Sequence, residues 1–132
     1  MFNPRKLSAL AVMMVLLLLL LTACASSAPK LPKTAAEAEI QSGTTGKTVT
    51  ITDEAQVKQV LDAFPTDYPD GQKETESTYG YRYAVTFRDA NNQEIGRCTV
   101  RNDNQLVCGE RVYAIDCTPI VAQIEAAISS QK

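Results

Sequence analysis

The feature that most constrains the fold is the alternating stretch GYRYAVTFR, which spans Gly80–Arg88. Large apolar and aromatic residues occupy every second position of this stretch: Tyr81, Tyr83, Val85 and Phe87. This period of two predicts a strand with one buried side. Short polar turns separate it from three further predicted strands at 94–101, 105–108 and 111–115. Because such tight connections join antiparallel neighbours, we expect the four strands to form a meander.

Two amphipathic helices are predicted on either side of the meander. Asp53 and Gln56 have the spacing of a capping box, and Pro65 ends the helix that follows. The apolar face of this helix consists of Val57, Val60, Leu61 and Phe64. A final helix is predicted from Thr118, as its N-cap, with Pro119 at its first position. The apolar face of the final helix consists of Ile120, Val121, Ile124 and Ile128.

Two short strands around the turn GTTG at 43–46 precede the first helix, which gives the order β-β-α-β-β-β-β-α. Each helix has one apolar stripe, and this stripe must lie on apolar sheet surface. The sequence therefore predicts an α+β fold, a curved antiparallel sheet with two packed helices, in a single domain at 37–132. Whether the helices share one face stays open. The polar stretch at 66–78 is predicted to be a loop.

The N-terminus has the features of an export signal. An almost unbroken apolar run, Leu7–Leu21, follows Arg5 and Lys6 and ends close to Cys24. A basic start, a short apolar core and small residues at its end are typical of a secretory signal. The run of about 15 residues is shorter than the roughly 20 that a membrane-spanning helix needs. An ordinary signal peptide and an uncleaved anchor are the alternatives.

The four residues Leu21-Thr22-Ala23-Cys24 resemble the lipobox of bacterial lipoproteins. The resemblance implies a signal peptide at 1–23, cleavage before Cys24, and a diacylglyceryl group on the Cys24 thiol. Two or more acyl chains, such as palmitate, anchor a protein stably. We therefore expect the mature chain on the extracytoplasmic face of the cell membrane. Residues 24–36 are predicted to be the lipidated cysteine and a flexible tether that spans roughly 20 Å.

Composition excludes several classes of function. Removal of residues 1–23 leaves 11 basic and 15 acidic side chains, a net charge of −4, and the basic residues do not cluster. This balance disfavours nucleic-acid binding, which needs a positive surface. Histidine is absent, which excludes Ser-His and Cys-His catalysis and removes the commonest zinc ligand. No catalytic residue, metal or cofactor is assigned.

The cysteines suggest a cross-strand pair. A turn centred on Asp103 places Cys98 directly opposite Cys108 on one side of the sheet. An exported domain can be oxidised, so a disulfide between them is one reading; two reduced, buried cysteines are the other. Cys117 would then be free, or would be the true partner of Cys98 or Cys108. The cysteine spacings lack the close ligand pair of a zinc site.

Three groups of polar residues are candidate sites. Four arginines, which can share the sheet face opposite the core, form a possible binding surface for an anionic partner: Arg82, Arg88, Arg97 and Arg101. Acidic residues gather in the 66–78 loop without the spacing of an EF-hand: Asp67, Asp70, Glu74 and Glu76. Three tyrosines could stack on a sugar or peptide: Tyr79, Tyr81 and Tyr83. Solvated surface residues and, for Tyr81 and Tyr83, a place in the core are the competing interpretations.

The stretches GKTVTITDEAQVKQVLDAF, YGYRYAVTFRD, NNQEIGRCTV and GERVYAID occur in this order before the terminal helix. They resemble a family of small lipoproteins from Gram-positive bacteria, many of them clostridial and most of them uncharacterised. The resemblance covers nearly all of 37–132 and implies no catalytic residue. We expect a membrane-anchored, non-catalytic module that binds a protein or polymer of the cell envelope. Alternatives are an assembly lipoprotein that packs on a membrane partner, and a hydrolase that uses only carboxylates, for instance Asp70 with Glu74.

Overall fold

The computed structural model describes residues 8–9, 11–15, 29–73 and 80–131. Residues 8–9 and 11–15 are helical. None of the helices in this described part of the chain is long and apolar enough to span a membrane. The predicted lipidation site, Cys24, lies outside the described residues, as do Glu74, Glu76 and Tyr79.

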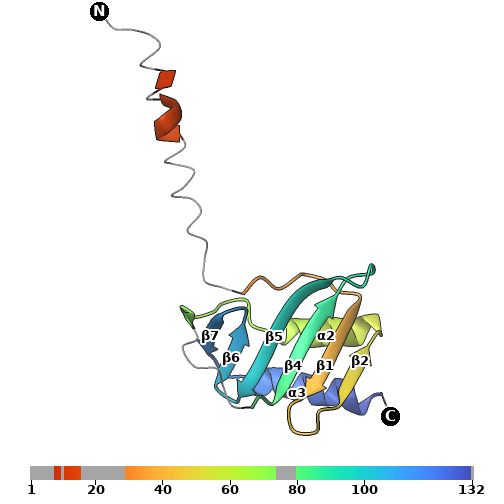
Figure 1. Ribbon diagram of the computed structural model, residues 1–132. Helices are drawn as coiled ribbons and strands as arrows, with labels where there is room; N and C mark the ends of the chain where they lie inside the picture. Colours follow the sequence, from red (N-terminus) through yellow and green to blue (C-terminus); the bar gives the residue numbers. More distant parts are fainter. Residues whose placement is uncertain (1–7, 10, 16–28, 74–79, 132) are drawn as a thin grey trace, which may run out of the picture.

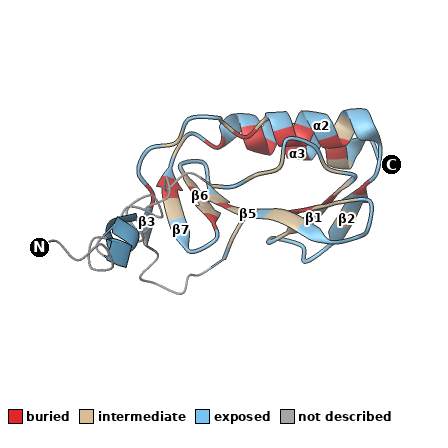
Figure 2. Cartoon of the chain, turned by 90° about the horizontal axis from the view of Figure 1, so that it is seen from above, coloured by how far each residue is buried: buried red, intermediate tan, exposed pale blue. Residues whose placement is uncertain are grey.

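Within residues 29–73 and 80–131, the domain has one antiparallel sheet of seven strands, with helices α2 and α3 on one of its faces (Figures 1 and 2). The elements are β1 (Glu37–Ser42), β2 (Thr48–Ile51), α2 (Glu54–Asp62), β3 (Gln72–Lys73), β4 (Tyr83–Arg88), β5 (Glu94–Asn102), β6 (Gln105–Cys108), β7 (Arg111–Ala114) and α3 (Thr118–Ser129). The strand order is β2-β1-β4-β5-β6-β7-β3. The predicted α+β fold and the meander of β4 to β7 are confirmed.

The strand β3 is an addition to the predicted order, within the stretch expected to be a loop. Gln72 pairs with Val112 of β7. Two contacts hold the chain there: the Arg111 guanidinium donates to the Gly71 carbonyl at 2.8 Å, and Gly71 lies close to the Tyr113 ring. A Cβ atom on Gly71 would approach the Tyr113 ring to 2.7 Å. These contacts depend on tertiary packing and leave no local pattern in the sequence.

The core lies between the sheet and the two helices. Its fully buried members include Ile40, Phe87, Val100 and Tyr113 from the strands. The helices contribute the predicted apolar stripes, with Val57, Val60, Ile120 and Ile124 almost inaccessible to solvent. The helices also touch each other, and the Gln131 amide donates to the Gln56 side-chain oxygen at 2.8 Å. The question that the sequence left open is thereby answered: α2 and α3 share one face.

The two helix starts differ in how well they were predicted. The Asp53 carboxylate accepts a hydrogen bond from the Gln56 backbone amide at 3.0 Å, which is one half of the predicted capping box. The Gln56 side-chain oxygen accepts from Gln131. The prediction for α3 was wrong by one position, because Cys117 is the N-cap and makes no side-chain capping bond. Asp116 supplies the acceptor instead, bound by the Thr118 amide at 3.0 Å. Hydrogen bonds from the side chain and backbone of Thr118 lower the pKa of Asp116.

The described part of the predicted tether, residues 29–36, lies against the domain (Figure 1). Leu31 packs on the core, and the Ala36 amide donates to the Arg88 carbonyl at 2.9 Å. Gly96 of β5 makes this possible, since a Cβ atom there would approach the Pro32 ring to 2.9 Å and Leu31 to 3.3 Å. In the described residues, the chain thus lies on the domain from Pro29 onward, eight residues before β1. We call residues 29–36 the N-terminal strap.

Candidate functional site

The sheet face opposite the helices is the largest candidate surface. No helix covers it in the described part of the chain (Figure 2). Because side chains alternate along each strand, the partners of the core residues point outward here. One row across four strands follows from the pairing of Thr50, Glu39, Thr86 and Arg97. In this row Thr50 and Arg97 are exposed, Glu39 is half-buried and Thr86 is buried. The next row on the same face adds apolar groups to the polar ones: Gln41, Ala84, Thr99, Val107 and Val112.

The structure does not bring the four candidate arginines together on the open face. Arg88 lies beside β1, where its guanidinium is 3.9 Å from Glu37 and 3.6 Å from Glu39. About a quarter of the Arg88 side chain is exposed, as is about a quarter of Glu37. Arg88 is therefore neutralised by its own sheet and is a poor candidate for an anionic partner. Arg101 is half-buried at the bulge between Val100 and Asn102.

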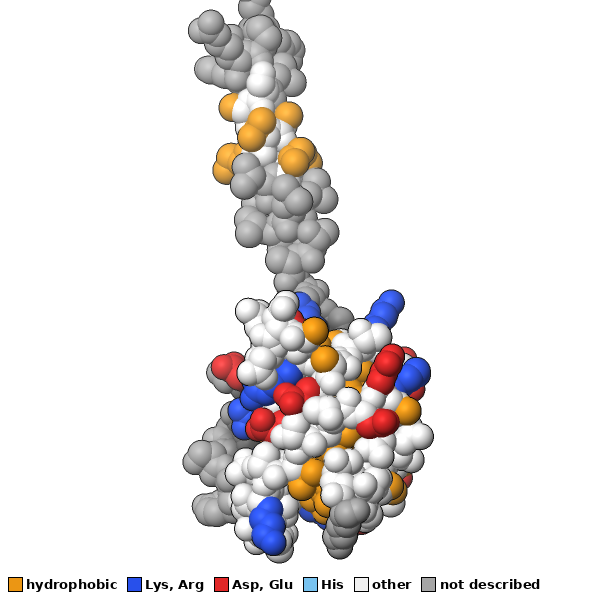
Figure 3. All heavy atoms as spheres, turned by 90° about the vertical axis from the view of Figure 1, so that its right-hand side faces the viewer, with side chains coloured by type: hydrophobic (Ala, Val, Ile, Leu, Met, Phe, Trp, Pro, Cys, Tyr) orange, Lys and Arg blue, Asp and Glu red, His pale blue; other side chains and the backbone are white. Residues whose placement is uncertain are grey.

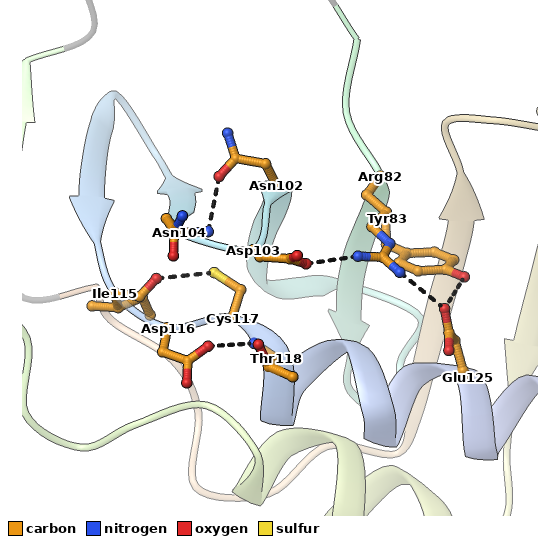
Figure 4. Close-up of polar contacts among 10 residues, drawn as sticks. All are labelled: Arg82, Tyr83, Asn102, Asp103, Asn104, Ile115, Asp116, Cys117, Thr118 and Glu125. Atoms are coloured by element: carbon orange, nitrogen blue, oxygen red, sulfur yellow. Dashed lines mark hydrogen bonds and ion pairs between the residues drawn. The ribbon is translucent and has the colours of Figure 1, made fainter.

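Arg82 turns away from the open face toward the helix side (Figure 4). Its guanidinium is 2.7 Å from Asp103 in the β5–β6 turn and 3.5 Å from Glu125 on α3. The Tyr83 hydroxyl donates to the same Glu125 carboxylate at 3.2 Å. Burial, followed by the charge of Glu125, raises the pKa of Tyr83. This group connects a strand end, a turn and a helix, so its arrangement serves the fold.

Arg97 is exposed, and among the described residues no carboxylate lies within ion-pair distance of it. It lines an open hollow of about 640 Å³ at the end of the sheet where the strap enters. The hollow also contains charged groups of both signs: Lys30, Glu94, Glu110 and Arg111. Its mixed charge does not select for an anion.

The predicted register of the two cysteines is confirmed. Cys98 lies opposite Cys108, Val100 lies opposite Leu106, and the two cysteine sulfurs form a disulfide. Cys117 is free and fully buried, with its thiol 3.6 Å from the Ile115 carbonyl (Figure 4). Burial, followed by the charges of Asp116 and Asp103, raises the pKa of Cys117 to about 11. A thiol in this state is protonated at neutral pH and is a weak nucleophile.

The remaining candidates form no reactive group in the part of the chain that the structure describes. Asp67 and Asp70 are exposed on the loop after α2. Tyr83 packs against the core, as predicted, and Tyr81 is half-buried just before β4. No set of three or more acidic or cysteine side chains among the described residues could hold a metal ion.

Two features of this surface escaped the sequence analysis. Leu31 was placed in the tether, although a lone leucine between Lys30 and Pro32 is a weak signal of a docked segment. Tyr68 was left in the loop, yet its ring packs edge-on against Tyr113 with centroids 5.2 Å apart. Tyr68 and Leu31 belong to segments without periodicity, where sequence patterns carry little information.

The chain matches no family model, no curated protein and no solved structure.

Proposed function

We propose that this protein is an extracytoplasmic lipoprotein, anchored through Cys24, whose domain binds a protein or polymer of the envelope without catalysing a reaction. The apolar run, its lipobox-like end and the resemblance to small Gram-positive lipoproteins support the anchor. The Cys98–Cys108 disulfide supports export, because such bonds persist in oxidising compartments. The open sheet face, which no helix covers in the described part of the chain, is the observation that carries the binding role.

A binding role fits the chemistry of the surface better than catalysis. The chain lacks histidine, the free thiol of Cys117 is buried and protonated, and the hollow near Arg97 is wide and open. A pair of carboxylates remains the alternative for a hydrolase, with Asp70 and Glu74 as its members. Asp70 is exposed to solvent, whereas enzymes adapt a carboxyl group to general-acid catalysis by burying it beside suitable neighbours.

The composition of the surface also favours a binding module over an assembly protein that packs on a membrane partner. In the described residues, the exposed large apolar side chains are Val12, Met13, Met14 and Val15, all within the predicted signal peptide. On the domain, charged, polar and small apolar groups intermix, as the side that carries β2 shows (Figure 3). A surface that packs permanently on an apolar partner would instead show a contiguous apolar patch.

Lipid attachment is tested in cells that export the full chain. A clickable fatty acid should label the wild type and fail to label Cys24→Ser, while Cys117→Ser should label as strongly as the wild type. Mass spectrometry of the mature protein should place its first residue at Cys24. Full labelling of Cys24→Ser would refute the anchor.

The binding role is tested by photocrosslinking in the cells that naturally produce the protein. A photoreactive amino acid at Thr99 reports on the open face, and the same amino acid at Lys58 reports on the exposed side of α2. We expect Thr99 to give one dominant adduct that Lys58 does not give. Equal adducts from both positions would contradict a binding role for the open face.

A further inference from the structure

The N-terminal strap fixes where the anchored chain enters the domain. Pro29 and Lys30 line the same hollow as Gly109 and Glu110 of the β6–β7 turn. From there the strap follows the upper end of the sheet in Figure 1 as far as β1. We call this the proximal end of the domain. The β1–β2 turn at 43–47 lies at the opposite, distal end.

The docked strap leaves a short connection to the lipid. Five residue steps separate Cys24 from Pro29, and a fully extended chain covers at most about 18 Å in five steps. The tether predicted from sequence alone would have extended to Ala36. Because residues 29–36 lie on the domain, they do not lengthen the free connection, which is too short to let the domain invert relative to the membrane.

The distal turn lies farther from Cys24 than the proximal end does, both in residues along the chain and in distance along the sheet. The Ala36 amide donates a hydrogen bond to Arg88, the last residue of β4. At the other end of β1, the Ser42 amide donates to the Lys47 carbonyl. Six residues of strand separate Ala36 from Ser42, which corresponds to about 20 Å. The proximal end stays near the lipid in every orientation, whereas the distal turn comes near only when the domain lies on its side.

We infer that the proximal end faces the lipid headgroups of the membrane, with the β1–β2 turn pointing away from it. The inference rests on the proposed lipid anchor and adds the orientation of the domain. The strands then run away from the bilayer, and the open sheet face is presented sideways to neighbouring molecules. The proximal end has exposed charges of both signs, from Lys30, Lys33 and Glu110. We therefore expect the short connection to set the orientation, rather than electrostatic attraction between these side chains and the headgroups.

The sequence contains no tryptophan, which permits single-tryptophan reporters. Glu110→Trp places the reporter at the proximal end and Thr44→Trp places it at the distal turn; both side chains are exposed. Each variant is purified from cells that export the full chain and is reconstituted into phosphatidylcholine vesicles that carry a nitroxide on the headgroup. Vesicle flotation measures attachment, and quenching of tryptophan fluorescence measures proximity to the headgroups. Circular dichroism verifies the fold of each variant.

We expect both variants to float, and we expect Glu110→Trp to be quenched at least about twofold more than Thr44→Trp, since their limits of approach differ by about 20 Å. Equal quenching of two floating variants would overturn the orientation and leave the anchor intact. Failure of both to float would refute the anchor itself. Raising the salt concentration should leave the difference unchanged, and its loss in salt would refute a tether-set orientation.

A lengthened connection provides the matched control. Twelve Gly and Ser residues inserted between Ser27 and Ala28 add roughly 20 Å of flexible chain. We expect the quenching of Glu110→Trp to fall to the level of Thr44→Trp while flotation persists. Undiminished quenching after the insertion would mean that the proximal end binds lipid by itself, which would overturn the inference that the short connection sets the orientation.

Discussion

Cys98 on β5 and Cys108 on β6 occupy opposite positions of one antiparallel pair, and a disulfide joins them with 4.4 Å between their Cα atoms. The bond links strands that are already neighbours through the turn at 102–104 and closes a loop with a sequence separation of 10. It lies under the core side of the sheet, where both cysteines are buried.

The first prediction concerns this bond. Loss of a disulfide that closes so short a loop should cost about 2–3 kcal/mol of unfolding free energy, mainly through the entropy of the unfolded chain. Denaturant unfolding of a chain without residues 1–23, with Cys24→Ser, should therefore show a lower midpoint after reduction. The double variant Cys98→Ala, Cys108→Ala should have the same unfolding midpoint with and without the reductant. Identical midpoints for the reduced and oxidised parent would contradict the bond.

The second prediction concerns the buried thiol of Cys117. In a Cys24→Ser chain, a thiol reagent at pH 8 should react slowly with native protein and rapidly, with one equivalent, after unfolding in urea. The folded pKa of about 11 exceeds the ordinary value of 9.0, so folding favours the protonated thiol. The corresponding stability is complete below pH 9 and is lost as the pH rises toward 11. Cys117→Ala should flatten this alkaline loss; rapid labelling of the native chain would contradict the burial.

The third prediction concerns Tyr68, whose hydroxyl oxygen is buried and has no hydrogen-bond partner among the described residues. Because an unpaired buried hydroxyl is costly, Tyr68→Phe should raise the unfolding free energy by about 1 kcal/mol at neutral pH. Burial raises the pKa of Tyr68 from 10.0 to about 12, so the parent should lose stability between these pH values, and the variant should lose less. A clear loss of stability in Tyr68→Phe at pH 7 would show that the hydroxyl is satisfied.

The fourth prediction concerns Gly96 and the strap. Gly96→Val would bring its Cβ atom to 2.9 Å from the rigid ring of Pro32, so the strap must move away. Trypsin should then cleave after the exposed Lys33 several times faster than in the parent. Thr99→Val, on the opposite face of the same strand, is the matched control and should cleave at the parental rate. Unchanged cleavage of Gly96→Val would contradict docking of the strap.

The fifth prediction concerns the ion pairs of Arg82. The side chains of Arg82, Asp103 and Glu125 are 42%, 62% and 52% exposed, so solvent screens their attraction. Arg82→Ala should therefore cost less than about 1 kcal/mol in chemical denaturation. A loss well beyond that value would indicate a structural role that screened charges cannot provide.

The sequence patterns predicted the elements whose periodicity is strong and local. The alternation of Tyr83 to Phe87 predicted β4, and the short turns predicted the register that places Cys98 opposite Cys108. The apolar stripes predicted both helices, because the spacing of their apolar residues places them on one face only when the segment is helical. These features depend on residues close together in the chain, where spacing alone determines which side chains share a face.

The candidate surface was less predictable, because it depends on long-range contacts. Alternation put Arg82 on the open face, but carboxylates on a distant turn and helix draw its guanidinium to the other side. Arg88 was on the predicted face, yet the sequence could not show that β1 places Glu37 and Glu39 beside it. The strap docks through the absence of a side chain at Gly96, and β3 forms through contacts of Gly71. None of these contacts has a periodic signature.

Within the described residues, the sheet ends in short strands on both sides, since β2 has four residues and β3 has two. An unpaired strand edge is a template on which other chains can add, and longer edges offer more hydrogen bonds to an intruder. Edge strands this short offer few backbone hydrogen bonds to a second copy of the chain. Short edges therefore favour a monomer, which would leave the open face free even where the proposed lipid anchor concentrates the protein on a membrane.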